Sequence, residues 1–452
     1  MKKRQFLKNA SLLLGGNLVM PLVSCDSNMN DDAPRFNWAG NLAYSTQNLD
    51  APIDRDNLRQ LVQEHDRIKP LGTRHSFNRI ADSKFRHLSL HQMSEDIEIE
   101  RENLTVRLAG GVPYGILAQK LQEAGFALHN LASLPHISVA GACATGTHGS
   151  GDQNGNLSTA VRAMDIVTAD GELVQLSEED SDFKGAVVGL GALGIVTGIS
   201  LSVLPTYSVR QHVYENLPLH QLQEHFEEIF SFGYSVSLFT DWQKERINQL
   251  WVKKRDLEIE ENQEINESFF GATLAKNHLH PIKEISPVNC TEQMGIPGPW
   301  HERLPHFKMD FTPSSGEELQ SEYFVPREHA VEAITALYAM GDEIFPHLFI
   351  SEVRSIQSDG LWLSPAYGRD SIALHFTWKP DWENVKKVLP KIENTLNVFG
   401  LRPHWGKLFT LSHSHLKKQY ERMDDFIGLM DKFDPKGKFH NEFLKNNILG
   451  KL

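Results

Sequence analysis

The chain has 452 residues, of which 40% are hydrophobic and 23% charged, and its formal net charge is −13. This length allows up to about three domains with a large buried core. The negative charge, without a basic stripe, argues against nucleic acid as a partner. The three cysteines (Cys25, Cys143 and Cys290) form no CxxC pair or metal-binding cluster. They allow at most one disulfide, so we expect a fold that does not depend on cross-links and a protein without a metal site.

The N-terminus has the pattern of an export signal. Basic residues precede the apolar run 10–23, which is too short and too interrupted to span a bilayer as a mature helix. Residues 3–8 (KRQFLK) resemble a twin-arginine signal with lysine in the first arginine position, and LVSC, ending at Cys25, resembles a lipobox. We therefore predict a signal peptide over 1–24, lipidation of Cys25 and a tether over 25–47, which would give an exported bacterial lipoprotein facing the periplasm or the cell exterior. A buried N-terminal helix is the alternative.

Two stretches indicate a nucleotide site. In residues 134–155 (LPHISVAGACATGTHGSGDQNG), the glycines are spaced too irregularly for one face of a helix or strand. Hydrogen-bonding side chains such as Thr145 and His148 lie among bare backbone N–H groups, a composition that suits a diphosphate. An ordinary surface loop is the alternative, but the stretch 72–82 (GTRHSFNRIAD) favours the nucleotide.

Together these stretches resemble the flavin-binding half of the vanillyl-alcohol-oxidase-type (PCMH-type) FAD-linked oxidoreductases, most closely the alditol (xylitol) oxidases, with the aldonolactone oxidases as relatives. The resemblance extends from about Asn48 to the C-terminus. It implies an α+β fold with a two-lobed FAD-binding domain over 48–207. A substrate domain built on a large antiparallel sheet with helices would follow over 208–430, and the segment 431–452 would return to the FAD domain.

The resemblance also implies where FAD binds. In the family, a histidine at the position of His75 carries the flavin covalently through its 8α-methyl carbon. A neutral imidazole nitrogen is a competent nucleophile, and Arg74 is placed to stabilise negative charge on the flavin. A solvated or capping histidine is the alternative for His75. The expected cofactor-binding residues are Gly72, Thr73, Arg74, His75, Ser76, Ser133, Ser138, Gly141, Thr145, Gly146, His148, Gly149, Ser150, Gly194, Ile195 and Val196.

The first half alternates between predicted helices and strands. We expect helices over 54–65 and 113–125, strands over 68–71 and 104–108, and a hairpin formed by 163–168 and 173–176. Residues 189–194 (GLGALG) match GxGxxG, but the β-branched run 195–201 that follows predicts a strand. A dinucleotide-binding fingerprint requires a helix there, so NAD binding is not supported.

The second half begins after Pro205, where the composition changes. We expect an amphipathic helix over 219–230, strands over 235–240, 250–253 and 319–325, and a helix over 328–340 closed by Gly341. Residues 255–315 are polar and irregular and carry no recognisable chemistry.

Two further strands carry polar pairs. In HLFISEVRS (347–355), alternation places Leu348, Ile350, Glu352 and Arg354 on one face, and in SIALHFTW (371–378) it pairs His375 with Thr377. An exposed Glu–Arg ion pair is the alternative. However, ISEVRS, DGLWLSPAYGRD, LHFTW and PHWGKLF occur in the order and spacing of alditol oxidases. By that similarity, Glu352, Arg354, His375, Thr377 and Lys407 line a polyol pocket, and Ser133 lies near the reactive edge of the flavin.

The implied activity is FAD-dependent oxidation of a primary hydroxyl of an alditol of the xylitol or sorbitol type, with hydride transfer to flavin N5 and reduction of O2 to H2O2. Lys407, relayed through His375, is the candidate base, and Arg354 and Lys407 would stabilise the developing alkoxide. Ala132 is the position expected to govern oxygen access, and we expect a monomer. The alternatives are an aldonolactone oxidase or dehydrogenase acting on D-arabinono-1,4-lactone or L-gulono-1,4-lactone, and a carbohydrate-binding lipoprotein without turnover.

Overall fold

The computed structural model describes residues 34–256, 266–309 and 318–451. The predicted signal peptide and its lipidation site, Cys25, lie outside these ranges. No helix within the described residues is both long enough and apolar enough to cross a lipid bilayer. Cys143 and Cys290 are both buried and both free thiols.

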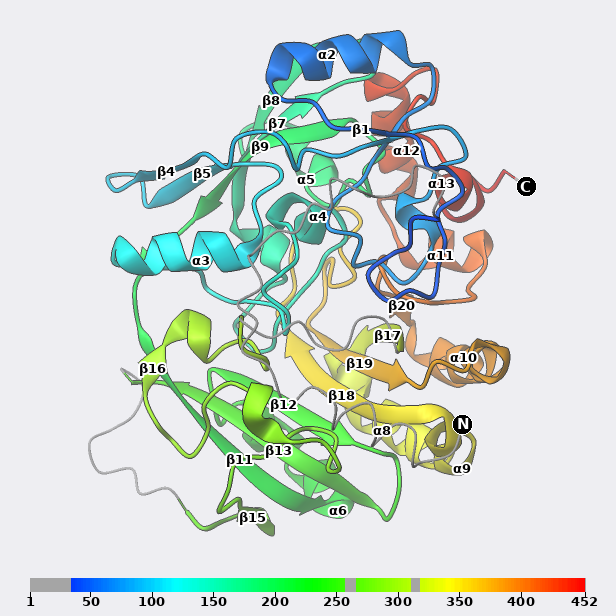
Figure 1. Cartoon of the computed structure of the whole chain (residues 1–452). Helices are drawn as coiled ribbons and strands as arrows, with labels where there is room; N and C mark the ends of the chain where they lie inside the picture. The colour runs from blue at the N-terminus through cyan, green and yellow to red at the C-terminus, as the bar shows by residue number, and fades with distance from the viewer. Residues whose placement is uncertain (1–33, 257–265, 310–317, 452) are drawn as a thin grey trace. The chain divides into compact units, whose positions relative to one another are not determined.

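A five-stranded antiparallel sheet forms the centre of the first half (Figure 1). Its spatial order is β4 (Ile97–Glu100), β5 (Thr105–Ala109), β9 (Ile195–Ser202), β7 (Val161–Val167) and β8 (Leu173–Ser177). The predicted hairpin is confirmed as β7 and β8. The run after GLGALG is confirmed as the central strand β9, which agrees with the exclusion of a dinucleotide-binding fingerprint.

Short parallel strands and helices surround this sheet. The strands β1 (Leu49–Asp50), β3 (His87–Leu88) and β2 (Lys69–Pro70) pair in parallel, and β6 (Phe126–Ala127) pairs with β10 (Leu204–Pro205). The helices are α2 (Arg55–Glu64), α3 (Tyr114–Glu123), α4 (Val139–Ala144), α5 (Phe183–Ala186), α11 (His413–Gln419), α12 (Met423–Phe433) and α13 (Glu442–Asn447). Helix α2 begins after Asp54, whose carboxylate accepts a hydrogen bond from the Asn57 N–H, as expected for an N-cap.

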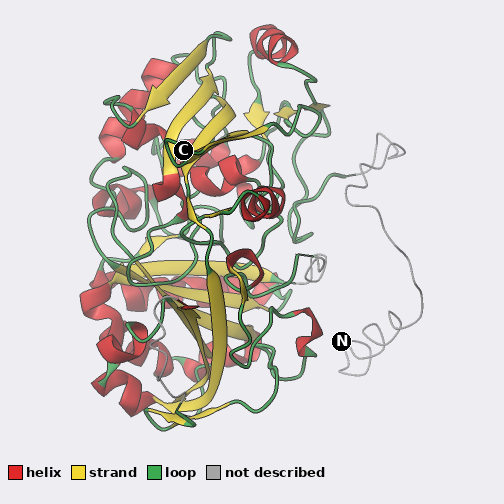
Figure 2. Ribbon diagram, turned by 90° about the vertical axis from the view of Figure 1, so that its left-hand side faces the viewer, coloured by secondary structure: helices red, strands yellow, loops and turns green. Residues whose placement is uncertain are grey.

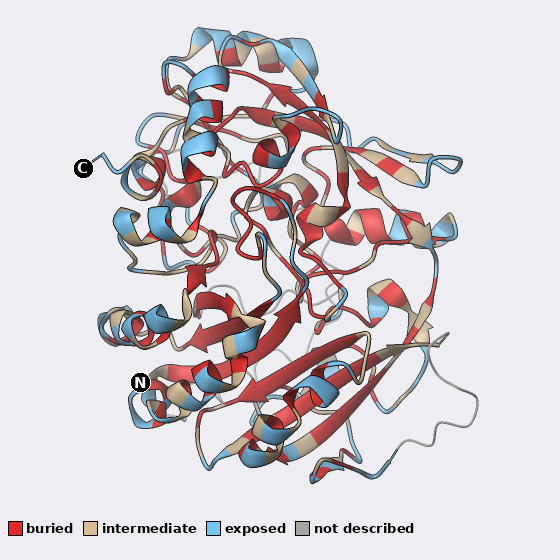
Figure 3. Cartoon of the chain, turned by 180° about the vertical axis from the view of Figure 1, so that it is seen from behind, coloured by how far each residue is buried: buried red, intermediate tan, exposed pale blue. Residues whose placement is uncertain are grey.

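The second half is built on a ten-stranded sheet. Its main path is β14 (Ser268–Phe269), β15 (Ala272–Leu274), β11 (Ser208–Pro218), β13 (Arg246–Arg255), β12 (Ser235–Thr240), β18 (Leu348–Ile356), β19 (Ser371–Trp378), β17 (Leu319–Pro326) and β20 (Arg402–Pro403), with β16 (Gly298–Pro299) paired to β11. All of these pairs are antiparallel. The strands are buried along most of their length, whereas the helices carry an exposed stripe (Figure 3).

Helices cover one face of this larger sheet (Figure 2). They are α6 (Leu219–Glu224), α7 (Phe226–Phe230), α8 (Ala330–Tyr338), α9 (Gly341–Ile344) and α10 (Trp382–Leu396). Their apolar residues form one core with sheet residues such as Val353, Leu374 and Phe376. Because neighbouring side chains on a strand point to opposite faces, Glu352 and His375 lie on the other face, which turns toward the first half.

Four sequence-based predictions need correction. The strand pairing shifts register between Leu348 and Ile350, as at a β-bulge. Leu348 therefore packs in the core between the larger sheet and its helices (the helix-side core) and does not share the face of Ile350. The predicted helix 219–230 is interrupted at His225. Gly341 begins the short helix α9 rather than closing α8. The glycine-rich stretch 134–155, expected to be irregular, includes the short helix α4.

The segment after residue 431 packs against the start of the first half. Phe439 is fully buried in a small core with Leu58 and Val62 of α2. The Asn441 side-chain amide donates to the carbonyls of Arg79, Ile80 and Asp82. The predicted boundaries at 207 and 430 remain predictions, because residues from Arg35 onward form a single compact unit.

The helix-side core yields a stability prediction. Leu374 has no exposed surface in that core, so Leu374→Ala would leave a cavity and lower the free energy of unfolding by about 2–5 kcal/mol. Leu173→Ala, on the edge strand β8 where Leu173 is 37% exposed, is the matched control and should cost at most about 1 kcal/mol. Urea denaturation of both variants measures the difference, and equal losses would contradict the assignment of this core.

Candidate active site

The loop after β2 holds His75 in a defined position. Arg74 has a φ of 65°, the left-handed region that is uncommon for residues other than glycine. The Arg74 carbonyl accepts a hydrogen bond from the Trp38 N–H at 2.8 Å. The His75 ring stacks on Trp38 with 5.2 Å between ring centroids, and His75 Nδ1 lies 3.1 Å from Thr73 Oγ1. Burial, helped by the nearby His136, lowers the pKa of His75 to about 4, so its imidazole is neutral at physiological pH.

A cradle of exposed backbone adjoins this loop. Ser138, the residue before α4, donates its N–H to Thr73 Oγ1 at 3.2 Å. A Cβ atom added to Gly72 would lie 3.1 Å from Ser138 Oγ, and one added to Gly141 would lie 2.7 Å from it. Both glycines are exposed. Without side chains, Gly72 and Gly141 therefore leave exposed backbone beside the Ser138 hydroxyl group, a surface that suits a diphosphate.

Some predicted cofactor residues have roles within the protein. The Thr145 hydroxyl donates to the Gly141 carbonyl at 3.2 Å, and Gly146 packs against Pro365. Ile195 and Val196 form the start of β9 within the five-stranded sheet, and Gly194, directly before them, packs against the Val167 carbonyl. The loop before them is tied to α4, because the Leu190 N–H donates to the Ala144 carbonyl at 3.0 Å.

Lys69 helps to hold that loop. Its ammonium group is fully buried and donates to the carbonyls of Leu190 at 3.3 Å, Gly191 at 2.9 Å and Phe439 at 3.4 Å. Burial lowers the pKa of Lys69 to about 7. This lysine therefore joins the strand that leads to His75, the 189–194 loop and the C-terminal segment.

The larger sheet presents a row of polar side chains toward this region. Glu352 on β18, His375 on β19 and Glu322 on β17 are directly opposite one another across three adjacent strands. Arg354 lies two residues from Glu352 on the same face, and Thr377 lies two residues from His375. All five are buried. Sequence reasoning placed four of these residues on this face but did not find Glu322.

Glu322 is the centre of an ion network. Its Oε2 lies 2.7 Å from Lys407 Nζ, and its Oε1 lies 2.7 Å from Arg354 Nη2 and 3.3 Å from His148 Nε2. Burial alone would raise the pKa of Glu322, but the charges of Lys407, His148 and Arg354 outweigh burial and hold it well below its usual range. Burial lowers the pKa of Lys407, opposed by Glu322. His148, which is predicted to bind the cofactor, faces this carboxylate.

A second carboxylate extends the network. Glu352 Oε1 lies 2.7 Å from His306 Nε2, and Glu352 Oε2 lies 3.6 Å from Arg354 Nε. The other ring nitrogen of His306 lies 3.3 Å from the ammonium group of Lys253, which is fully buried and also bonds the Leu304 carbonyl. Burial lowers the pKa of Lys253 to about 7. Lys253 and His306 were not predicted, and His306 belongs to the segment in which no chemistry was recognised.

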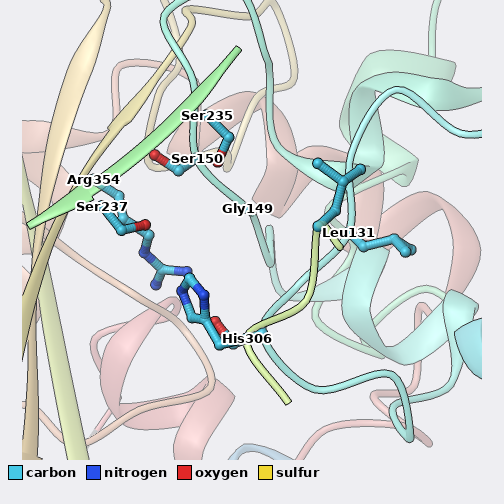
Figure 4. Close-up of a pocket in the computed structure, with 9 residues that line it drawn as sticks. Leu131, Gly149, Ser150, Ser235, Ser237, His306 and Arg354 are labelled. Carbon is cyan, nitrogen blue, oxygen red and sulfur yellow. The ribbon is translucent and has the colours of Figure 1, made fainter. Parts of the chain in front are cut away.

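The polar face and the glycine-rich loops meet at a cavity (Figure 4). Arg354 and His306 point into it. The lining residues are Leu131, Ser133, Gly149, Ser150, Ser235, Ser237, Leu304, His306 and Arg354. Arg354 Nε is buried there and has no hydrogen-bond partner among the described residues. Ser133, predicted to contact substrate, therefore shares a cavity with Arg354.

Backbone contacts link the His75 loop to Lys407. The Phe77 N–H donates to the Gly406 carbonyl at 2.7 Å, and the Asn78 side-chain amide donates to the carbonyls of Trp405 at 2.8 Å and Lys407 at 2.6 Å. In contrast, Lys407 and His375 share no hydrogen bond in the described part of the chain. His375 Nε2 pairs instead with Gln320 Oε1 at 3.2 Å.

Glu322 had a recognisable sequence signal. In LQSEYFVP it is the only charged residue of a strand that is otherwise largely apolar, and alternation places it on the same face as Gln320. His306 and Lys253 gave a weaker signal, because the first lies in an irregular segment and the second follows an apolar run that also predicts an ordinary strand.

Comparison with known proteins gives consistent matches. Residues 55–177 match the family model "FAD binding domain", and residues 306–447 match the model "D-arabinono-1,4-lactone oxidase". The alditol oxidase of Streptomyces sp. is 45% identical over 92% of this chain and 99% of its own length. The L-gulono-1,4-lactone dehydrogenase of Mycobacterium tuberculosis is 26% identical over 92% of this chain and 98% of its own length.

A solved structure shows the same fold. The cholesterol oxidase of B. sterolicum superimposes with a TM-score of 0.72 at 15% identity, covering 95% of this chain and 100% of that chain. This likeness, together with the FAD-binding match, confirms the predicted α+β architecture with a large antiparallel sheet. Because its similarity to alditol oxidase spans nearly the whole of both proteins, this chain belongs to the alditol oxidase family of FAD-dependent oxidoreductases.

Proposed function

We propose that the protein oxidises a primary hydroxyl group of an alditol of the xylitol or sorbitol type. The observation that carries this proposal is the buried polar row of Glu352, His375 and Glu322 beside Arg354 and Lys407, in a chain 45% identical to an alditol oxidase. FAD, when bound, supplies the acceptor for the hydride that leaves the carbinol carbon. The remaining tasks are to bind the polyol, orient it and manage its proton, and these fall to the residues of the site.

The residues of the His75 loop and the glycine cradle suit FAD. Gly72 and Gly141 leave exposed backbone beside Ser138, where a Cβ atom would fill the space that a diphosphate needs. We propose that His75 is the covalent attachment point. Its ring is neutral and fixed against Trp38, so a ring nitrogen has a free electron pair for bond formation.

The polar face suits an uncharged chain of hydroxyl groups. Hydroxyls both donate and accept hydrogen bonds, so a matching site needs carboxylate, imidazole and hydroxyl partners in a row. Glu352, His375, Thr377 and Ser133 supply these groups by the proposed assignment. Arg354 and Lys407 are the cations placed to stabilise the negative charge that develops on the reacting oxygen.

Substrate choice separates the two candidate activities. Residues 306–447 match the D-arabinono-1,4-lactone oxidase model, which keeps an aldonolactone as the second candidate. We expect anaerobic mixing with xylitol or sorbitol to bleach the flavin absorbance faster than mixing with L-gulono-1,4-lactone. Admitting O2 should then restore the absorbance and yield H2O2, since O2 is the proposed acceptor. Faster bleaching by the lactone would reverse the order of the candidates, and no bleaching by either class would refute both.

Lys407 should be required for substrate oxidation and not for cofactor binding. Lys407→Met removes the cation paired with Glu322, so we expect the rate of flavin reduction by xylitol to fall by about 10²–10⁴-fold. The absorption spectrum of the bound flavin should be unchanged. Lys436→Met, at an exposed position, is the matched control and should reduce normally. Wild-type reduction rates in the Lys407 variant would exclude the assigned role.

Covalent attachment through His75 has a direct test. Acid precipitation of the wild-type protein should leave a yellow pellet with flavin fluorescence, because a bond from imidazole to the flavin survives unfolding. His75→Ala should release its flavin into the supernatant, whereas His91→Ala, at an exposed loop position, should keep it in the pellet. A colourless wild-type pellet would show that FAD is held without a covalent bond.

We also propose that the mature protein is exported and anchored through lipid on Cys25. The support is the LVSC tetrapeptide after a short apolar run with basic residues before it. The anchor would hold an acidic protein at a membrane surface that its own charge does not favour. Labelled palmitate should be incorporated by bacteria producing the wild-type protein and not by those producing Cys25→Ser, which should move to the soluble fraction. An unlabelled wild-type protein would refute lipidation.

A further inference from the structure

Oxidation of an alcohol releases a proton from the hydroxyl group, and this proton needs an acceptor. Lys407 Nζ lies 2.7 Å from Glu322 Oε2 and donates a hydrogen bond to it. As an ammonium group, Lys407 has no free electron pair and cannot accept another proton. Arg354 is permanently protonated and cannot act as a base. Neither cation of the site can therefore take the proton unless it first gives one away.

We infer that Glu322 accepts the substrate proton through Lys407. This inference rests on the proposed oxidation of an alcohol and assigns a role to a residue that sequence reasoning did not find. Glu322 acts through Lys407 and does not touch the substrate, so it is a positioning residue that also stores a proton.

Exposure separates the two members of the pair. The Lys407 side chain is 15% exposed, whereas the Glu322 side chain has no exposed surface. Lys407 therefore reaches from accessible space into the protein, and Glu322 is sealed behind it. A substrate hydroxyl can therefore contact the ammonium group of Lys407 more readily than the buried carboxylate of Glu322.

Several of the other titratable groups near Lys407 and Glu322 have partners of their own. Glu322 is faced by Lys407, by Arg354 from β18, by His375 from β19, and by His148 and His404. His375 Nε2 is paired with Gln320. Glu352 is bonded to His306 and lies beside Arg354, and Glu318 accepts a hydrogen bond from Gln320; neither carboxylate has a hydrogen bond to Lys407 within the described residues. The Lys407–Glu322 pair is thus a direct path from Lys407 to an ionised carboxylate.

The proposed step consists of two proton transfers and one hydride transfer. An N–H bond of Lys407 breaks and its proton forms an O–H bond on Glu322 Oε2, which leaves a free electron pair on Lys407 Nζ. That pair takes the proton of the substrate hydroxyl, while the carbinol carbon loses its hydride to the acceptor named in the proposed function and becomes a carbonyl carbon. After the step, Glu322 is a neutral acid and Lys407 is again an ammonium group.

Glu322→Gln tests the relay, because it keeps the shape of the side chain and removes the acceptor. The rate of flavin reduction by xylitol should fall by about 10²–10⁴-fold at neutral pH. In this variant Lys407 must lose its proton to water before the substrate reacts, so the rate should rise about tenfold per pH unit below the Lys407 pKa. A purely structural loss would not be rescued by high pH. Glu328→Gln, whose side chain is 78% exposed, is the matched control and should behave like the wild type.

Lys407→Arg is a second variant that preserves the charge. Arginine can keep the ion pair with Glu322, but its guanidinium cannot pass a proton on at these pH values. Its reduction rate should therefore fall as far as that of Glu322→Gln, and the variant combining both changes should be no slower than either alone, because the two residues act as one unit. Additive losses would overturn the relay.

Infrared difference spectroscopy detects protonation of the Glu322 carboxylate directly and does not depend on a turnover measurement. Anaerobic reduction of the wild-type protein by xylitol should produce the carbonyl band of a newly protonated carboxylic acid, and this band should be missing from Glu322→Gln. Wild-type protein that is reduced by xylitol without this band would overturn the relay and leave the proposed function intact. Wild-type protein that is reduced by neither xylitol nor sorbitol would refute the proposed function itself.

Discussion

The site depends on burying charges together. Arg354 and Lys407 flank Glu322, and Arg354 also borders Glu352, so each cation has a carboxylate within 4 Å. Moving a single ion from water into the protein interior costs several kcal/mol, and a partner at contact distance with good geometry is needed to offset that cost. Removing one member would leave an uncompensated buried charge. The arrangement is therefore all-or-none, and it holds the reactive face in one geometry.

The register of the larger sheet creates this arrangement. Glu322, His375 and Glu352 are neighbours because β17, β19 and β18 pair antiparallel without a shift between these residues. The opposite face is anchored by helices through residues such as Val353 and Leu374. A one-residue slip would turn the polar row into that apolar core, so helix packing and charge pairing enforce the same register.

Much of the fold was predictable because its signals are local. The strands 235–240 and 371–378, the hairpin after Val161 and the strand after GLGALG all follow from alternation and turn residues. The bulge near Leu348 was not predictable, because it depends on pairing with Trp378 across the sheet. His306 was missed for a similar reason, since only folding brings an irregular segment to within 2.7 Å of Glu352.

Charge pairing also bears on what the site can recognise. Because Arg354 and Lys407 are paired with Glu322 and Glu352, these described residues offer no unpaired cation to attract an anionic sugar acid. The site must then distinguish one substrate from another by the hydrogen bonds that its buried polar side chains make to the substrate's hydroxyl groups. A site of this kind strongly rejects an analogue that lacks the matching hydroxyl, because the buried polar groups would be left unpaired.

An open-chain alditol can present a hydroxyl to each member of the row in turn. A closed lactone ring has fewer hydroxyl groups and holds them in fixed directions, which makes the extended polyol the better match to this face.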